Sequence, residues 1–371
     1  MANRKAQLPG TRRFRACLAT VLVVALVAEC HANPFEYTWE HVSDSVWAGI
    51  RADPFELPQE GNTALVITAD GAVVFDAGGS PAMGEAIVAK VKELTNRGVT
   101  DIVISHWHGD HMRGLQAIVK AYPSSNIIAH ADARRWIVET SDKWLKRRVS
   151  MVPNIRRGVD AALADGKDLS GRPLTDAESA WLKAGLGIAD QLDAENRRTE
   201  YIVPNVTITA GMTLFRGGRE LRILQLGKAH TASDLVLWLP AEKIVATGDI
   251  VTAPVPLMPS AYTATYRDVL HQLAALDFAA LIPGHGAIQH DTKYLSLLED
   301  TIASVVAQVH ALAGKGLDKD KVIEGVDLTA LETRFTGGDP FLAHRFEDYV
   351  KQALPAAAYQ VELTGEPAET F

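Results

Sequence analysis

Cysteine is almost absent from this 371-residue chain, which contains only Cys17 and Cys30. Both lie in a leader with the features of a secretory signal: five basic residues, then the apolar run 16–28 and a cleavage site ending at Ala32. Cleavage after Ala32 would leave a mature chain, from residue 33 onward, without cysteine. Disulfides and thiolate metal ligands are thereby both excluded from the mature chain.

Long apolar runs are also scarce. The run 16–28 is shorter than the ~20 residues that a membrane-spanning helix needs, so an uncleaved anchor is the weaker interpretation of the signal peptide 1–32. No later segment is expected to have the required length and apolarity. We therefore expect a secreted, periplasmic protein without stable membrane insertion after cleavage.

Basic residues are not in surplus. The whole chain has a formal net charge of −8 at pH 7, and removing the leader takes away five basic residues and one acidic residue, which changes the net charge to −12. An acidic surface of this kind disfavours nucleic-acid phosphate as a partner. The expected partner is a small-molecule substrate, and the sequence carries no signal for an oligomeric state.

Strand-like and helix-like runs alternate from residue 46 onward, which indicates an α/β domain. In the first half the expected strands are 46–50, 63–68, 73–75, 101–105 and 126–129, and the expected helices are 81–97 and 114–121. The dipeptide Asp70-Gly71 predicts a hairpin turn. In the second half the expected strands are 202–208, 221–226, 235–239 and 244–247.

Two other segments are predicted to be helical. Residues 132–200 are charged, favour helix and contain three tryptophans, Trp136, Trp144 and Trp181. We expect them to form a helical insert of two or more helices. Residues 293–371 form the second segment, a helical C-terminal extension with helices at 295–312 and 341–354. Residues 33–371 are expected to be a single domain that includes both segments.

The densest group of metal-ligand side chains is the segment His106-Trp107-His108-Gly109-Asp110-His111. It places three imidazoles and one carboxylate directly after the strand-like run 101–105. Zn²⁺ prefers such nitrogen and oxygen ligands, and four of them would be costly to bury unpaired. Alternation along the strand aims His106 and His108 the same way, while the glycine turn directs Asp110 and His111 to a neighbouring point. The segment therefore suits two adjacent metal ions.

Three further candidate ligands lie in loops after apolar strand-like runs. They are His230 in Gly227-Lys228-Ala229-His230-Thr231, Asp249 in Thr247-Gly248-Asp249 and His285 in Pro283-Gly284-His285-Gly286. A histidine in a glycine-rich turn is weak evidence by itself. Together with the first segment, the set becomes specific.

This order of motifs resembles that of the metallo-β-lactamase superfamily, in which His-x-His-x-Asp-His is followed by a distant His, an acidic or thiol residue and another His. Every element is present between positions 106 and 285. The resemblance implies an α/β fold, the four-layer αβ/βα sandwich, with two mixed sheets face to face, helices outside and metals at one edge. The leader, the helical insert and the tail lie outside the resemblance.

The resemblance also implies two zinc ions per chain and assigns their ligands. His106, His108 and His230 would bind one ion, and Asp110, His111 and His285 would bind the second. Asp249 stands where some β-lactamases carry a cysteine ligand. Aspartate occupies this place in the glyoxalase II-like thioesterases, where it bridges the metals. The cysteine-free mature chain independently excludes a thiolate ligand.

The chemistry expected of such a site is hydrolysis. Two adjacent zinc ions would lower the pKa of a shared water toward ~7 and make hydroxide available at neutral pH. The hydroxide would attack a carbonyl group, and Asp110 is the expected catalytic residue that orients it and moves its proton. No protein nucleophile is needed, so Ser105, Thr231 and Ser233 are interpreted as structural.

Four residues near these motifs are given smaller roles. Asp76, at the end of a strand, is expected to organise the ligands rather than to bind metal. Asp234 is expected to support the His230 loop by hydrogen bonding. Lys228 and Tyr262 flank ligand-bearing loops and are candidate substrate contacts. The alternative, which needs no function, is that both side chains are simply exposed to solvent. The remaining histidines are interpreted as structural or surface residues.

We therefore expect a secreted dinuclear zinc hydrolase that cleaves an amide, ester, lactone or thioester bond. β-Lactam ring opening is one specific version and is compatible with export. A glyoxalase II-like thioesterase or lactonase is an alternative that Asp249 favours and the leader weakens. A non-catalytic zinc-binding module is the alternative of another class. A flavodiiron-type oxidoreductase is disfavoured, because its pattern has Glu at the position of His108.

The helical insert 132–200 follows directly after the first half of the ligands. This position motivates the hypothesis that the insert overhangs the metal edge and determines which substrate enters.

Overall fold

The computed structural model describes residues 34–51, 54–55, 57–168 and 171–367. The predicted leader and both cysteines lie outside the described residues. Phe35–Phe371 forms one compact unit by its internal contacts.

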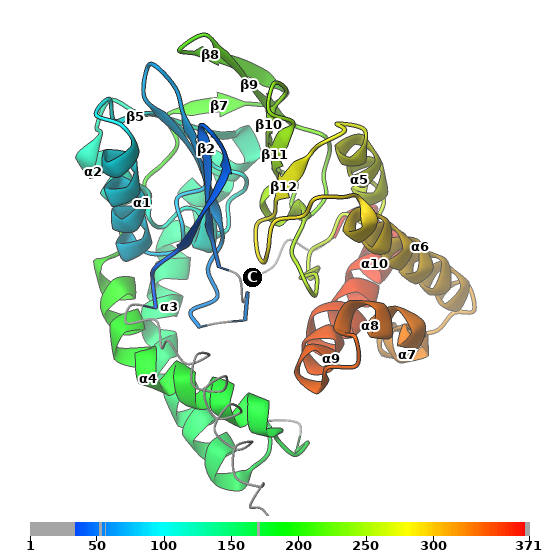
Figure 1. Cartoon of the computed structure of the whole chain (residues 1–371). Helices are drawn as coiled ribbons and strands as arrows, with labels where there is room; N and C mark the ends of the chain where they lie inside the picture. The colour runs from blue at the N-terminus through cyan, green and yellow to red at the C-terminus, as the bar shows by residue number, and fades with distance from the viewer. Residues whose placement is uncertain (1–33, 52–53, 56, 169–170, 368–371) are drawn as a thin grey trace, which may run out of the picture. The chain divides into compact units, whose positions relative to one another are not determined.

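Two mixed β-sheets form the centre of this unit (Figure 1). The first has the order β1-β2-β3-β4-β5-β6-β7 and consists of β1 Thr38–Ser43, β2 Val46–Ile50, β3 Thr63–Ile67, β4 Ala72–Phe75, β5 Val99–Val103, β6 Asn126–His130 and β7 Val206–Ile208. The second has the order β12-β11-β10-β9-β8 and consists of β8 Met212–Arg216, β9 Arg219–Leu224, β10 Val236–Leu239, β11 Ile244–Ala246 and β12 Ala280–Ile282. Strands β4 to β7 are parallel to one another, as are β11 and β12.

The sheets pack face to face through apolar side chains on their inner faces, and a central strand such as β4 is buried on both of its faces. Successive side chains of a strand point to opposite faces. In β4, Val73 and Phe75 belong to a buried cluster that also contains Leu237 and Leu239 of β10. The alternate residue Val74 packs in a different cluster with the helices on the outer face of the first sheet.

The outer face of each sheet is covered by helices. Helices α1 Pro81–Leu94 and α2 Leu115–Ala121 pack on the first sheet, and α5 Tyr266–Ala274 and α6 Lys293–Ala313 pack on the second (Figure 1). Helices, sheet, sheet and helices make four layers. This arrangement confirms the αβ/βα sandwich that the resemblance implies.

Helix α6 is long and apolar enough to cross a bilayer, by length and composition only. The expectation that no segment after the leader has this length and apolarity is therefore wrong. Its residues Leu298, Ile302 and Val305 are fully buried in the core that covers the second sheet. A helix that packs one apolar face into a core meets the same length and apolarity criteria.

The segment predicted as a helical insert contains two long helices, α3 Ala131–Asp165 and α4 Asp176–Arg198, which pack on each other. Helix α4 begins with a capping box: the Thr175 side chain accepts a hydrogen bond from the Glu178 amide, and the Glu178 carboxylate accepts one from the Thr175 amide. The C-terminal helices are α7 Lys319–Gly325, α8 Thr329–Thr336, α9 Pro340–Phe346, the π-helical turn η3 Glu347–Gln352 and α10 Ala353–Thr364. The sequence patterns predict one helix at 341–354, where the structure has three successive helical elements.

Candidate metal centre

The seven predicted ligands lie on loops that meet at one edge of the two sheets. His106 and His108 follow β5, and Asp110 and His111 lie in the short helix η1 Gly109–His111. Asp249 lies in η2 Gly248–Ile250 after β11, His285 follows β12, and His230 precedes β10. Because β5, β11 and β12 end at this edge, their following loops converge there.

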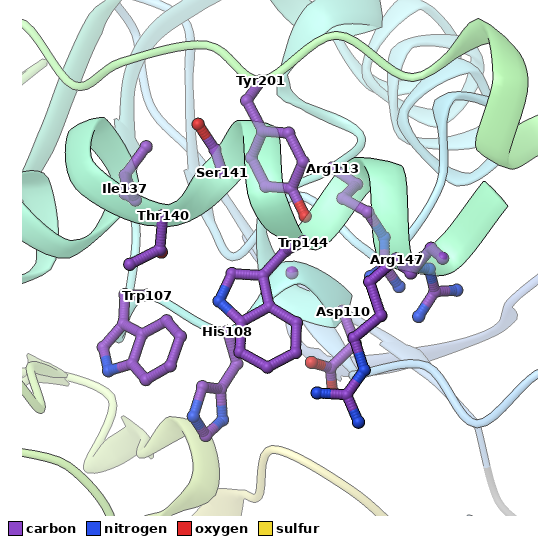
Figure 2. A pocket seen from close by; sticks show the side chains of 12 residues that line it. Trp107, His108, Asp110, Arg113, Ile137, Thr140, Ser141, Trp144, Arg147 and Tyr201 are labelled. Carbon is purple, nitrogen blue, oxygen red and sulfur yellow. The ribbon is translucent and has the colours of Figure 1, made fainter. Parts of the chain in front are cut away.

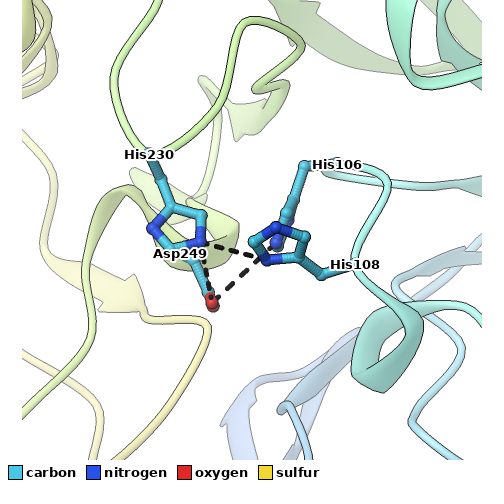
Figure 3. Close-up of side chains that lie close together, drawn as sticks. All are labelled: His106, His108, His230 and Asp249. Carbon is cyan, nitrogen blue, oxygen red and sulfur yellow. Dashed lines mark hydrogen bonds and ion pairs between the residues drawn. The ribbon is translucent and has the colours of Figure 1, made fainter. Parts of the chain in front are cut away.

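One group of ligand atoms comprises His106, His108, His230 and Asp249, shown in Figure 3. One ligand atom from each residue lies within 4.8 Å of all the others. Oδ2 of Asp249 is 3.9 Å from Nε2 of His106 and 3.5 Å from Nε2 of His230. Nε2 of His230 is 3.1 Å from Nδ1 of His108. Three imidazoles and one carboxylate thus surround one point.

A second group comprises Asp110, His111, His285 and, again, Asp249. Nε2 of His111 is 3.2 Å from Oδ2 of Asp110 and 3.1 Å from Oδ1 of Asp249. Nε2 of His285 is 3.1 Å from Oδ2 of Asp110 and 3.5 Å from Oδ1 of Asp249. Asp249 therefore directs Oδ2 to the first group and Oδ1 to the second, which is the arrangement expected of a bridging carboxylate.

These residues fit a pair of divalent cations. Nε2 of His106, Nε2 of His111 and Oδ1 of Asp249 are buried and make no hydrogen bond within the described part of the chain, although Nε2 of His111 and Oδ1 of Asp249 face each other at 3.1 Å. Buried polar atoms without a hydrogen bond are costly, and a cation at each group would bind these atoms. Donor sets of imidazole and carboxylate without sulfur suit zinc.

The electrostatics of the site favour the ligand form of these side chains. Burial lowers the pKa of His106 and of His108 well below the ordinary value and also lowers that of His230, so these imidazoles are neutral. Burial alone would raise the pKa of Asp110 and of Asp249, but the neighbouring His111 holds both well below their usual range. Neutral imidazole and ionised carboxylate are the forms that bind a metal.

His111 behaves differently from these three imidazoles, and so does His285, whose pKa is raised by the carboxylates of Asp249 and Asp110 although burial would lower it. Burial would also lower the pKa of His111, but the same two carboxylates raise it well above the ordinary value. A proton and a metal ion therefore compete for this position, and metal binding would release the proton.

Buried hydrogen bonds hold the ligands in orientation. Asp76 accepts hydrogen bonds from the amide and hydroxyl of Ser105, both at 2.8 Å, and its Oδ2 is 2.9 Å from Nδ1 of His111. Asp234 accepts from the amide and hydroxyl of Thr231, the residue after His230, at 2.9 and 2.7 Å. Asp76 thus contacts His111, and Asp234 contacts the residue that follows His230.

The local backbone at Asp249 requires glycine. Gly248 has a φ of 53°, in the left-handed region, and a Cβ there would lie 2.5 Å from Cβ of Ser105. Gly284, in the loop after β12, lies against the Asp249 side chain. A Cβ at Gly284 would lie 2.0 Å from Oδ1 of Asp249. The glycines next to the predicted ligands thus let two loops approach closely enough to share one carboxylate.

Two pockets open onto the ligands. The first is a cavity of about 200 Å³ shown in Figure 2, and helix α3 forms one wall of it. It is lined by Trp107, His108, Gly109, Asp110, Arg113, Ile137, Thr140, Ser141, Trp144, Arg147, Arg148 and Tyr201. The second, of about 210 Å³, is lined by Asp249 and His285 together with His108, Asp110, Arg148, Tyr349 of the C-terminal extension and residues of neighbouring loops. His108 and Asp110 thus line both pockets.

Several of these pocket residues were not identified from the sequence. The sequence marks Trp144 only as one tryptophan of the insert, and Arg113, Arg148 and Tyr201 carry no signal beyond lying near or after the first motif. Conversely, the candidate substrate contacts Lys228 and Tyr262 line neither of the two pockets. Lys228 instead forms an ion pair with Glu366 at 2.6 Å and lies over the ring of the buried Tyr262.

The comparisons by sequence agree with this fold. The sequence profile of the metallo-beta-lactamase superfamily matches residues 58–285. A linear primary-alkylsulfatase from Pseudomonas sp. (strain ATCC 19151) is 24% identical over 280 residues, which cover 71% of this chain and 49% of the sulfatase. The chain therefore spans about half the length of that relative. A lactamase-like protein from Pestalotiopsis microspora is 32% identical over 88 residues, 23% of this chain and 27% of that protein.

Two solved structures illustrate the similarity of fold. A metallo-beta-lactamase from Pontibacter korlensis has a TM-score of 0.51 at 17% identity and covers 72% of this chain and 99% of its own. A stereoselective inverting sec-alkylsulfatase from Pseudomonas sp. has a TM-score of 0.58 at 16% identity and covers 90% of this chain and 51% of its own. A larger share of this fold thus has a counterpart in the sulfatase.

Proposed function

The chain belongs to the metallo-β-lactamase superfamily, and we propose that it is an exported hydrolase that uses two zinc ions to cleave an ester-type bond, with sulfate esters as the favoured substrate class. The observation that carries the dinuclear site is the shared carboxylate of Asp249, whose two oxygens face two separate ligand groups. Export rests on the signal features of residues 1–32.

Bound zinc ions would supply an activated water with a pKa near ~7. The chain's own contribution is to hold and orient. His111 and His285 both lie against Oδ2 of Asp110, so this carboxylate is fixed in place. Its side chain is 23% exposed, compared with 2% for Asp249. Asp110 is therefore the carboxylate ligand that can reach a reacting group from the pocket and accept its proton.

The substrate class rests on two supports. The first support is the similarity in sequence to a linear primary-alkylsulfatase, whose name gives sulfate esters as its substrates. The pocket of Figure 2 combines arginines with tryptophans next to the ligands, which suits an ester that has both an anionic and an apolar part. β-Lactam ring opening, and lactone or thioester hydrolysis, are the other versions of the same chemistry that an assay must separate.

Metal content and a substrate panel test the proposal. Elemental analysis of the purified protein is expected to give two zinc ions per chain, and His111→Ala is expected to lose about one. The panel contains octyl sulfate, a chromogenic β-lactam, a lactone, a thioester and a phosphodiester, each with and without chelator. Chelator-sensitive turnover of octyl sulfate is the expected result.

Other results would contradict parts of the proposal. One zinc ion in the wild type would exclude the dinuclear mechanism. Turnover of the β-lactam or the thioester without turnover of octyl sulfate would replace the substrate class but retain the hydrolase. Two bound zinc ions without turnover of any substrate would favour a non-catalytic zinc-binding module.

A further inference from the structure

Three charged residues, Glu60, Arg113 and Arg148, lie beside the candidate metal ligands but do not belong to the ligand set. Glu60 is 1% exposed and Arg113 is 4% exposed. Nη2 of Arg113 donates a hydrogen bond of 2.8 Å to Oε2 of Glu60, and Nε of Arg113 donates to the carbonyl of Gly79. Arg113 and Glu60 thus form a closed, buried ion pair, in which burial would lower the pKa of Arg113 but Glu60 raises it.

Arg148 lies on the other side of the same carboxylate. Its Nη2 is 3.7 Å from Oε1 of Glu60, which is too long for a hydrogen bond. Oε1 of Glu60 has no hydrogen-bond partner among the described residues. The guanidinium groups of Arg113 and Arg148 therefore both face the Glu60 carboxylate, but only that of Arg113 is hydrogen-bonded to it.

The side chain of Arg148 is nevertheless held in place. It comes from α3, and its Nε donates a hydrogen bond of 3.0 Å to Oδ1 of Asn196 in α4. Asn196 is itself buried, at 4% exposure. Within the described part of the chain the two terminal nitrogens of Arg148 make no hydrogen bond, while the side chain is 26% exposed.

Arg148 also occupies a shared position between the two pockets. It lines both of them, as do His108 and Asp110 of the metal centre. Burial and the nearby charge of Arg113 lower the pKa of Arg148 to about 10. A cation in this environment is under-compensated, so an anion placed against its open donors would be stabilised by charge-assisted hydrogen bonds.

We propose that Arg148 is a substrate-binding residue of the helical insert, which recognises an anionic oxygen group of the substrate next to the metal centre. The chemistry that fits its guanidinium is a sulfate, sulfonate or carboxylate group, joined to an apolar group that occupies the cavity along α3. The inference rests on the proposed function for the identity of the reaction, but not for the binding of the anion. It assigns to α3 a chemical role in addition to forming a wall of the pocket.

Binding of non-hydrolysable probes to the zinc-loaded full chain tests the assignment by calorimetry. The probes are octane-1-sulfonate, octanoate and the neutral methyl octyl sulfone. In Arg148→Gln the dissociation constants of the two anions are expected to rise about 10- to 100-fold, the loss typical of a hydrogen bond to a charged group. The dissociation constant of the sulfone is expected to change less than twofold.

Two further variants complete the experiment. Arg148→Met keeps the apolar stem of the side chain and is expected to show the same loss of anion binding. It replaces Arg148→Gln in the test if that variant does not fold. Arg156→Gln is the matched control, because Arg156 joins the same two helices through Asp190 at 2.7 Å but lines neither pocket. It is expected to bind all three probes like the wild type.

The outcomes separate this inference from the proposed function. Equal loss of sulfone and sulfonate binding in both Arg148 variants would assign Arg148 a structural role and overturn the inference. Unchanged anion binding, or a wild type that binds neither anion, would also overturn it. Selective loss of anion binding in a protein that turns over no ester would support the inference while contradicting the proposed function.

Discussion

Oδ2 of Asp76 lies 2.9 Å from Nδ1 of His111, and the opposite nitrogen of that ring faces Asp110 and Asp249. Asp76 therefore determines which edge of the imidazole points to the metal position. The same carboxylate accepts two hydrogen bonds from Ser105. A ligand held in this way by a carboxylate has a fixed tautomer and a higher basicity.

Replacing Asp76 by asparagine is expected to weaken zinc binding by about 10- to 100-fold. The residue has a φ of 61°, which asparagine tolerates better than most residues, so the substitution removes the charge without straining the backbone. Competition with a chromogenic chelator measures the affinity. Asp70→Asn, in the exposed turn between β3 and β4, is the control. Equal zinc affinities in the two variants would show that Asp76 does not support the ligand.

Gly284→Ala is expected to reduce the zinc content below two per chain. A Cβ at this position would lie 2.0 Å from Oδ1 of Asp249 and 2.7 Å from the carbonyl carbon of Gly248. Either the shared carboxylate or the loop that carries His285 must move. Elemental analysis after gel filtration measures the loss.

The control for this substitution is Gly187→Ala in α4, where nothing lies within 4 Å of an added Cβ. It is expected to leave the zinc content unchanged and to stabilise the fold by about 0.5–1 kcal/mol, because alanine favours helix over glycine. Full zinc occupancy in Gly284→Ala would mean that the loops can separate without losing the site.

The clustering of the candidate ligands could be predicted from the sequence for a physical reason. His106 to His111 are consecutive in the chain and follow a strand, so their proximity does not depend on the rest of the fold. His230, Asp249 and His285 are far apart in the sequence, but each follows or precedes a strand-like run, and strand ends converge in a sheet. The four-layer sandwich, which the structure confirms, was implied by the family resemblance that the order of the motifs carries, and not by the spacing itself.

The pocket residues could not be predicted in the same way. Arg148 and Trp144 lie on a 35-residue helix with charged residues on much of its surface. Its composition does not indicate which face lies above the metals. Glu60 and Arg113 are 53 positions apart, and a lone buried ion pair leaves no periodic signal. Such contacts depend on tertiary packing, which local patterns do not contain.

Glu178 gives a prediction on pH dependence. Burial alone would raise the pKa of this carboxyl group, but hydrogen bonds from Arg172 and Thr175 lower it to about 2. Since an unfolded glutamate titrates near ~4.3, the ionised form stabilises the fold fully above that pH. The contribution is lost as the pH falls from ~4.3 through about 2.

Glu178→Gln is expected to lower the free energy of unfolding by about 1–2 kcal/mol at pH 7. The difference from the wild type should narrow as the pH falls below ~4.3. Urea denaturation of the metal-free proteins measures both values, so that loss of zinc in acid does not contribute. Glu139→Gln serves as the control, because Glu139 is an exposed residue of helix α3. A pH-independent difference for Glu178→Gln would contradict the assigned pKa.

The leader can be tested by mass spectrometry after expression in a bacterium with a secretion pathway. We expect the periplasmic fraction to contain a chain that begins at Asn33, because the predicted cleavage site ends at Ala32. Recovery of the full-length chain in the membrane fraction would instead indicate an uncleaved anchor.

Trp144 tests whether the insert selects substrates by their apolar part. Its side chain points from α3 toward His108 in Figure 2 and lines the cavity with Trp107 and Ile137. Burying an apolar group of a substrate against such a side chain contributes about 1.5–3 kcal/mol. Trp144→Ala is therefore expected to raise KM for an octyl ester about tenfold or more, to leave kcat nearly unchanged and to have little effect on an ethyl ester.

Val138→Ala provides the comparison, since Val138 is on the same helix, is 56% exposed and lines neither pocket. Equal effects of Trp144→Ala on long and short esters would mean that the cavity does not receive the apolar part of the substrate.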